Sequence, residues 1–188
     1  FPNLKLLLTV PSAAARPFVT IPCPQTPGFD AGWRDDMQHH GGEYWWYVCL
    51  SPDDPYANLF IAQTTAQHRA LFWQTWTHHV DGLLYWGMNF WSWYESQWPS
   101  GVGAQTTRIS RADWPDVASV PDHPGDGFAI YPGPTPAQPM SSIRLEAIRD
   151  GEEDYEYFVM LQSLLEKATA AGRSDAATAD AESALDAA

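Results

Sequence analysis

The feature that most constrains the fold is a set of four short, nearly continuous apolar runs. They occupy residues 5–10, 18–23, 43–50 and 83–91. Runs of this length, closed by proline or turn residues, are typical of strands buried on both faces, as in parallel sheets. The sequence therefore predicts an α/β fold with a parallel sheet. Four strands are too few to close an eight-stranded barrel, but they suffice for half of one.

Capping signals place two helices after the third strand. Thr64 and Gln67 have the spacing of a capping box, which predicts a helix over residues 64–80. Ser141 or Ser142 is the expected N-cap of a long helix that ends near residue 171. The predicted order is strand, strand, strand, helix, strand, helix.

The remaining segments complete the predicted organisation. About one helical turn is expected near residues 35–40, and residues 92–140 carry little periodicity, which in a segment this long usually indicates a functional loop. We expect residues 1–171 to form one domain. Residues 172–188, rich in alanine and aspartate, are expected to form a helical or frayed tail.

Charge and composition exclude several classes of protein. The chain has 10 Lys and Arg against 23 Asp and Glu, a net charge of −13, whereas nucleic-acid binding needs a basic face. No apolar stretch is long enough to span a membrane. No P-loop, Rossmann glycine pattern or zinc-type Cys/His spacing occurs, so we expect no cofactor and no metal. Cys23 and Cys49 can form at most one disulfide, and their state stays open.

The chain has 10 tryptophans, an unusual number for 188 residues, and several of them follow predicted strands. In a parallel α/β sheet the site lies beyond the carboxyl ends of the strands. Asp30 and Trp33 follow the second strand, whereas Asn89, Trp91 and Glu95 lie at or beyond the end of the fourth. Aromatic rings suit the apolar C–H faces of sugars, and carboxylates and amides suit their hydroxyls. The residues thus favour a carbohydrate ligand.

Strand parity divides the aromatic residues of the third strand between two faces. Trp45 and Tyr47 share one face and Trp46 the other, so that one set lines a pocket and the other packs under helices. Sequence leaves open which set does which. The segment 144–157 is dense in charge, and Arg149 can pair along the helix with Glu146 and Glu153, which predicts a structural ion-pair network. A substrate contact from Arg144, near the start of this helix, is the lower-ranked alternative.

Five blocks of sequence resemble one known family in their order and content. Together they are similar to the C-terminal half of domain-of-unknown-function family 4091, which includes glycoside hydrolase family 123, the β-N-acetylgalactosaminidases. The resemblance covers most of residues 4–165. The blocks occupy residues 42–58, 69–74, 81–87, 126–134 and 141–157.

The resemblance implies a (β/α)₈ TIM-type barrel of which this chain supplies about strands five to eight. It also implies retaining hydrolysis of terminal N-acetylhexosamine, in which the substrate's own acetamido oxygen attacks the anomeric carbon. In that family an adjacent Asp-Glu pair assists, and this chain contains no Asp followed directly by Glu. We therefore expect the catalytic pair and the rest of the barrel to come from upstream residues of the same enzyme or from a second chain. Secretion or a periplasmic location is expected from the family alone.

Within this resemblance, the chain is expected to supply an aromatic wall that binds the carbohydrate substrate. Trp86 and Asn89 differ in parity, so Asn89 can face the same way only if it lies past the end of a regular strand. Two alternatives remain: a non-catalytic carbohydrate-binding protein, and a barrel glycosidase for another sugar. The predicted wall residues are Trp45, Tyr47, Trp86, Asn89 and Tyr131, with Trp91, Glu95 and Arg144 ranked lower.

Overall fold

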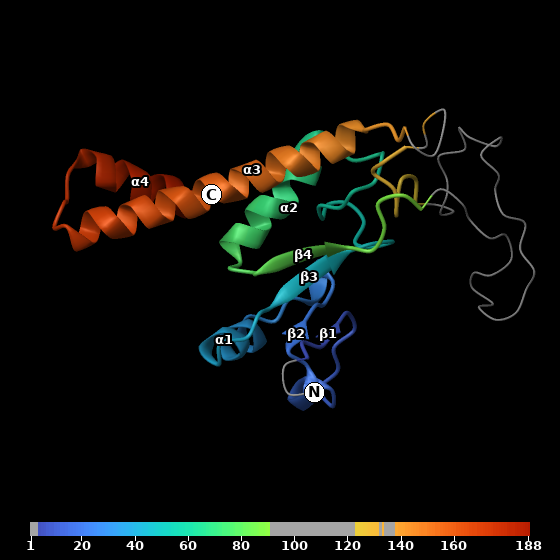
Figure 1. Ribbon diagram of the computed structural model, residues 1–188, viewed down its shortest axis with the longest axis horizontal. Helices are drawn as coiled ribbons and strands as arrows, with labels where there is room; N and C mark the ends of the chain where they lie inside the picture. The colour runs from blue at the N-terminus through green and yellow to red at the C-terminus, as the bar shows by residue number, and fades with distance from the viewer. Residues whose placement is uncertain (1–3, 91–122, 132, 134–137) are drawn as a thin grey trace, which may run out of the picture.

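The computed structural model describes residues 4–90, 123–131, 133 and 138–188 (Figure 1). Two of the predicted site residues, Trp91 and Glu95, lie outside these ranges. The strands are β1 (Leu7–Leu8), β2 (Ile21–Pro22), β3 (Trp45–Val48) and β4 (Gly82–Tyr85). The helices are η1 (Arg16–Phe18), η2 (Thr26–Gly28), α1 (Ala31–His39), α2 (Thr65–Thr77), α3 (Ile143–Ala170) and α4 (Ala176–Asp186).

The strands form two parallel ladders that follow the chain order. β1 pairs with β2, and β3 pairs with β4 in a register that sets Trp45 opposite Gly82 and Tyr47 opposite Leu84. A parallel bridge between Gln25 and Tyr47 links the end of β2 to β3. Figure 1 shows the two ladders below the long helices. The carboxyl ends of the strands therefore lie toward one edge.

The fourth strand is shorter than predicted. Residues 83–91 were expected to be extended, but β4 ends at Tyr85. Gly87 lies against the backbone of Gly127, where a Cβ atom would come within 2.9 Å of the Gly127 carbonyl oxygen. The chain leaves the sheet here because the segment after Tyr85 pairs with residues near 128 instead, and Asn89 forms an antiparallel bridge to Phe128.

The two predicted helix starts are confirmed, and a third helix is longer than expected. Thr64 and Gln67 make the reciprocal hydrogen bonds of a capping box at the start of α2, and Ser142 caps α3 by accepting from the Leu145 N–H. The single turn predicted near residues 35–40 is in fact α1, which begins earlier because Asp30 accepts a hydrogen bond from the Trp33 N–H at 3.0 Å.

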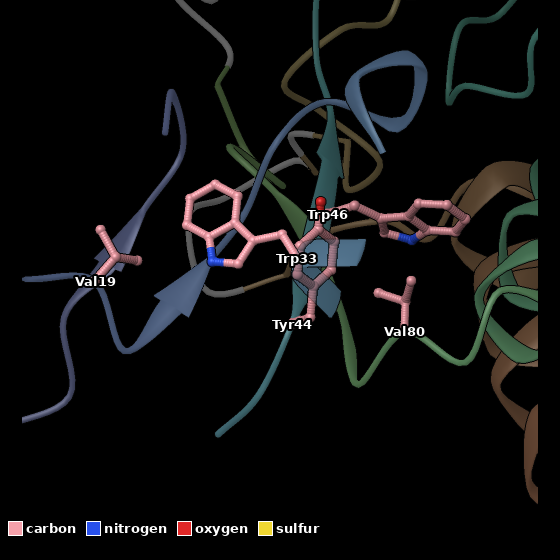
Figure 2. Close-up of a cluster of buried hydrophobic side chains, with 5 residues drawn as sticks. All are labelled: Val19, Trp33, Tyr44, Trp46 and Val80. Atoms are coloured by element: carbon pink, nitrogen blue, oxygen red, sulfur yellow. The ribbon is translucent and has the colours of Figure 1, made fainter. Parts of the chain in front are cut away.

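The core lies between the sheet and the helices in two adjacent clusters. The first contains Val19, Trp33, Tyr44, Trp46 and Val80, and Figure 2 shows Trp46 pointing from the sheet toward the helices. There its indole N–H donates to the Thr75 hydroxyl at 3.0 Å. The second cluster contains Val48, Ala57, Leu59, Leu71 and Phe72. Both clusters lie on the face of β3 that carries the Trp46 and Val48 side chains.

Helices α2 and α3 pack directly on each other (Figure 1). Asp154 on α3 accepts hydrogen bonds from the Arg69 guanidinium and, at 2.7 Å, from the Trp73 indole N–H on α2. The Asp154 side chain is only 13% exposed, and its hydrogen bond with Arg69 lowers the pKa of the carboxyl. This carboxylate is therefore the main polar link between the two helices among the described residues.

We expect Asp154→Ala to lower the free energy of unfolding by about 1 to 3 kcal/mol, because three hydrogen bonds from α2 to this carboxylate, two from Arg69 and one from Trp73, are lost. Urea denaturation followed by circular dichroism measures this. The control is Glu153→Ala on the same helix, whose ion pair with Arg149 spans 3.7 Å between exposed side chains and is expected to contribute less than about 1 kcal/mol. Equal losses in both variants would contradict the role given to Asp154.

Candidate functional site

The two faces of β3 have different surroundings, which resolves the alternative that parity left open. Trp46 and Val48 are buried under the helices, whereas Trp45 and Tyr47 lie on the opposite face and are partly exposed. The register carries this face onto Gly82 and Leu84 of β4, and Trp86 is the first residue after that strand. We use the name open face for the side of Trp45, Tyr47 and Leu84 together with Trp86 just past the end of β4.

Trp45 lies toward the amino end of the open face. Its indole ring covers Gly82, where a Cβ atom would come within 2.4 Å of the ring. Its N–H donates to Glu43 at 3.0 Å, and hydrogen bonds from Lys5 and Trp45 lower the pKa of that carboxyl. Trp45 is therefore held in place near the amino end of β3. A ligand is expected at the other end, beyond the carboxyl ends of the strands.

Tyr47 lines a pocket of about 370 Å³ at the carboxyl ends of β1 and β2. At this pocket Arg16 donates to Asp30 at 2.6 Å and lies 4.3 Å from the centre of the Trp33 ring. The Trp33 N–H and Arg16 lower the pKa of Asp30, and burial raises the pKa of the Tyr47 phenol. One cation, one anion and aromatic surface suit a neutral ligand with many hydroxyls. The lining also includes Thr9, Val10, Pro11, Ala13, Pro24, Gln25, Gly28 and Tyr44.

Trp86 carries an exposed ring with an anchored edge. The residue is 41% exposed, yet its indole N–H donates to both carboxylate oxygens of Asp126, at 2.9 and 3.0 Å. Asp126 is fully buried, and burial raises the pKa of its carboxyl against the opposing effect of hydrogen bonds from Trp86, Tyr85 and the Gly127 N–H. Sequence reasoning did not select Asp126, although it lies in one of the five blocks; its contact with Trp86 spans 40 residues.

Two other predicted wall residues come near this place in the fold. Asn89 forms the bridge to Phe128, and the Tyr131 ring lies 5.8 Å from the Phe128 ring. Tyr131 in turn forms an antiparallel bridge with Met140. The structure therefore gathers Trp86, Asn89 and Tyr131 around the segment 125–131, past the end of β4.

Arg144 is 1% exposed and is bound to backbone carbonyls. Its guanidinium donates to the carbonyl oxygens of Leu59 at 2.8 Å, Gly125 at 2.6 Å and Phe128. The predicted ion pairs of Arg149 with Glu146 and Glu153 are confirmed, and Arg149 also pairs with Asp150. Arg144 thus joins the start of α3 to the segment that holds Asp126.

His68 is buried beside Arg144 and is held as a neutral ring. Its Nε2 lies 2.9 Å from the Phe60 carbonyl oxygen, which fits an Nε2–H donor. The Nδ1 atom is buried with no hydrogen-bond partner among the described residues. Burial, with Arg144 nearby, lowers the pKa of His68 below its ordinary 6.5. A proton added to Nδ1 would place a positive charge in the protein interior with no hydrogen-bond acceptor among the described residues.

Because the folded pKa of His68 lies below the unfolded one, its contribution to stability is complete above pH 6.5 and is lost as the pH falls. We expect the free energy of unfolding to be lower at pH 5.5 than at pH 7.5 because of this residue. Urea titrations at both pH values measure it. The difference should shrink in His68→Asn and persist in His39→Asn, a change at an exposed histidine; an unchanged difference in His68→Asn would contradict this assignment.

Within the described ranges no group of three or more His, Cys, Asp or Glu side chains is placed to hold a metal ion. Cys23 and Cys49 are both free thiols. None of the helices in the described part of the chain is long and apolar enough to cross a membrane.

Comparison with known proteins identifies the family. The family model described as "Glycoside hydrolase 123, catalytic domain" matches residues 20–161, well over half of the chain. A solved family 123 glycoside hydrolase from Clostridium perfringens, reported in a study of glycolipid glycan hydrolysis, is similar with a TM-score of 0.54 and 20% identity. That similarity covers 80% of this chain and 24% of the other, so the chain spans about a quarter of that protein. No curated protein matches. On the family match, the chain belongs to the glycoside hydrolase 123 catalytic domain family.

Proposed function

We propose that this chain is the carbohydrate-binding part of a glycoside hydrolase that removes terminal N-acetylhexosamine, such as β-linked N-acetylgalactosamine. The observation that carries the proposal is the family match together with two aromatic side chains, Tyr47 and Trp86, on the open face toward the carboxyl edge of the strands. The exposed Trp86 ring suits the C–H face of a sugar ring. The pocket beside Tyr47 offers Arg16 and Asp30 to hydroxyl groups.

The reaction we propose is substrate-assisted and retaining. The carbonyl oxygen of the 2-acetamido group attacks the anomeric carbon while a carboxylic acid protonates the departing glycosidic oxygen. Water then opens the cyclic intermediate and returns a proton to the carboxylate. This chain, which has no adjacent Asp-Glu pair, binds and orients the sugar in that scheme, and the acid comes from residues outside it.

We further propose that the strands are the C-terminal half of a (β/α)₈ barrel. Parallel ladders in chain order, with helices on one face and an open face on the other, support this arrangement. Among the described residues, β1 and β4 each pair along one edge only, and further parallel strands would continue from the free edges. The partner is then the remaining half of the same enzyme or a second chain.

A sugar titration of the 188-residue chain tests the proposal. We expect N-acetylgalactosamine to bind more tightly than galactose and to protect tryptophan fluorescence from quenching. Its affinity for Tyr47→Ala should be at least fivefold lower, because a stacking contact and a hydrogen bond are each worth about 1 kcal/mol. The chain alone should not hydrolyse 4-nitrophenyl N-acetyl-β-galactosaminide. Equal binding of galactose would contradict the acetamido specificity. Hydrolysis by the chain alone would contradict the proposal that the catalytic acid comes from residues outside it. If no sugar binds, the proposed function as a whole is contradicted.

One observation favours a second candidate function, a carbohydrate-binding protein without catalysis. The absence of the Asp-Glu pair is what such a protein would show. The two candidates differ in whether the polypeptide flanking these residues contains the pair, and in whether the complete protein hydrolyses the aryl glycoside. Binding without hydrolysis by the complete protein would favour the second candidate.

A further inference from the structure

The indole of Trp86 is fixed on one side and open on the other. Its six-membered ring lies against the backbone of Gly127, where a Cβ atom would come within 2.4 Å of it. The Phe90 ring lies 5.0 Å away, centre to centre, at a tilt of 57°. Even so, 41% of the residue remains exposed. The exposed part of the ring is available for contact with a ligand.

The polar edge of the same ring is bound inside the protein. Both oxygens of the buried Asp126 carboxylate accept from the Trp86 N–H, and the Tyr85 hydroxyl lies 3.3 Å from one of them. Tyr85 packs on the helix side of the sheet and accepts from the Gly127 N–H at 2.7 Å. One carboxylate therefore contacts two consecutive aromatic residues, the last residue of β4 and the residue that follows it.

The segment that carries Asp126 is itself anchored from the far side. Arg144 on α3 holds the carbonyl oxygens of Gly125 and Phe128, the residues on either side of Asp126 and Gly127. A rigid acceptor removes the rotational freedom that an exposed indole otherwise keeps. A platform oriented before the ligand arrives binds more tightly, because less ordering remains to be done on binding.

We propose that Asp126 is a positioning residue that holds the Trp86 indole as a ready platform for the sugar ring. The inference rests on the proposed function and deepens it. Asp126 does not touch the sugar; it acts through Trp86. The chemistry required of the ligand is an apolar C–H face, which a pyranose presents, against the exposed side of the indole.

The first test is a double-mutant cycle on affinity for N-acetylgalactosamine. Asp126→Ala removes the acceptor and is expected to weaken binding about tenfold, equivalent to about 1.4 kcal/mol. Asp126→Asn keeps one acceptor oxygen and should recover most of that loss. In a Trp86→Phe background, which keeps a ring but has no N–H, Asp126→Ala should change affinity by less than about twofold. An equal loss in both backgrounds, or no loss with Trp86 intact, would overturn the proposal.

The second test needs neither a sugar nor a change at Asp126. The Trp86 indole N–H resonance, assigned by its absence in Trp86→Phe, should shift with pH as Asp126 titrates. Trp45 is the matched control, since its N–H donates to Glu43, a partly exposed carboxylate. Burial raises the pKa of Asp126 and hydrogen bonds lower that of Glu43, so the Trp86 signal should move at the higher pH. The other titratable or charged groups facing Asp126 are Tyr85, His123 and Arg144.

The two tests separate the positioning role from the proposed function. A Trp86 signal that is insensitive to pH, or that follows Glu43, would overturn the positioning role even if sugar binds. If the wild-type chain binds no sugar, the proposed function and the platform fail together, while the indole titration still decides whether Asp126 holds the ring.

Discussion

Replacing Arg144 with methionine is expected to lower the free energy of unfolding by about 3 to 5 kcal/mol. The guanidinium is buried and donates to three carbonyl oxygens that come from segments near residues 59 and 125–128. Methionine fills similar volume but donates nothing, so the three buried carbonyls lose their partners at about 1 to 3 kcal/mol each before the structure relaxes. The loss is a large fraction of the roughly 5 to 15 kcal/mol by which domains are typically stable.

Two variants make this expectation specific. Arg149→Met removes an arginine from the same helix, but its side chain is 59% exposed, so solvent screens its ion pairs and a much smaller loss is expected. Arg144→Lys keeps the charge, yet a compact ammonium cannot reproduce the planar fork, so an intermediate loss is expected. Urea unfolding at pH 7.5 measures all three. A loss with Arg144→Met no larger than with Arg149→Met would show that the three carbonyls are satisfied in another way.

Local signals in the sequence predicted the helix starts well. Thr64 with Gln67, and Ser142, each satisfy backbone N–H groups within three residues, so the information needed lies within one turn of helix. The alternation of Trp45 and Tyr47 with Trp46 also correctly separated two faces. Alternation alone could not say which face lies under the helices, because that depends on Thr75 and Leu71, far along the chain.

Long-range contacts were beyond the reach of those signals. The ion pairs of Arg149 lie within about one helical turn and could be predicted, whereas Arg144 binds backbone carbonyls up to 85 residues away, which no local spacing indicates. Asp126 is similar, since nothing local indicates that a carboxylate beside two glycines binds an indole 40 residues earlier. The segment after Tyr85 was predicted as strand because the apolar run continues through it. Sequence periodicity cannot detect the close approach of Gly87 to Gly127, which accompanies the end of the strand at Tyr85.

Gly127→Ala is expected to have the largest effect on sugar binding among changes that keep all polar groups. Gly127 has φ +76°, a conformation that costs alanine about 1 kcal/mol or more. Its new Cβ would also meet the Trp86 ring at 2.4 Å, so the indole must move and leave Asp126. With one charge-assisted hydrogen bond lost as well, we expect a total loss of about 3 kcal/mol in stability. Affinity for N-acetylgalactosamine should fall about tenfold, because the platform is no longer in place.

Gly41→Ala is the matched control, because it separates backbone strain from displacement of the indole. Gly41 has φ +73°, almost the same conformation, but nothing lies within 4 Å of the Cβ position. It should therefore show only the strain, about 1 kcal/mol, with unchanged sugar affinity and an unchanged Trp86 indole resonance. Urea unfolding, sugar titration and the indole spectrum are measured on both variants. If the two glycines behave alike in all three measurements, the Trp86 ring is not held against Gly127 in solution, and the open face does not contain a platform set by Asp126.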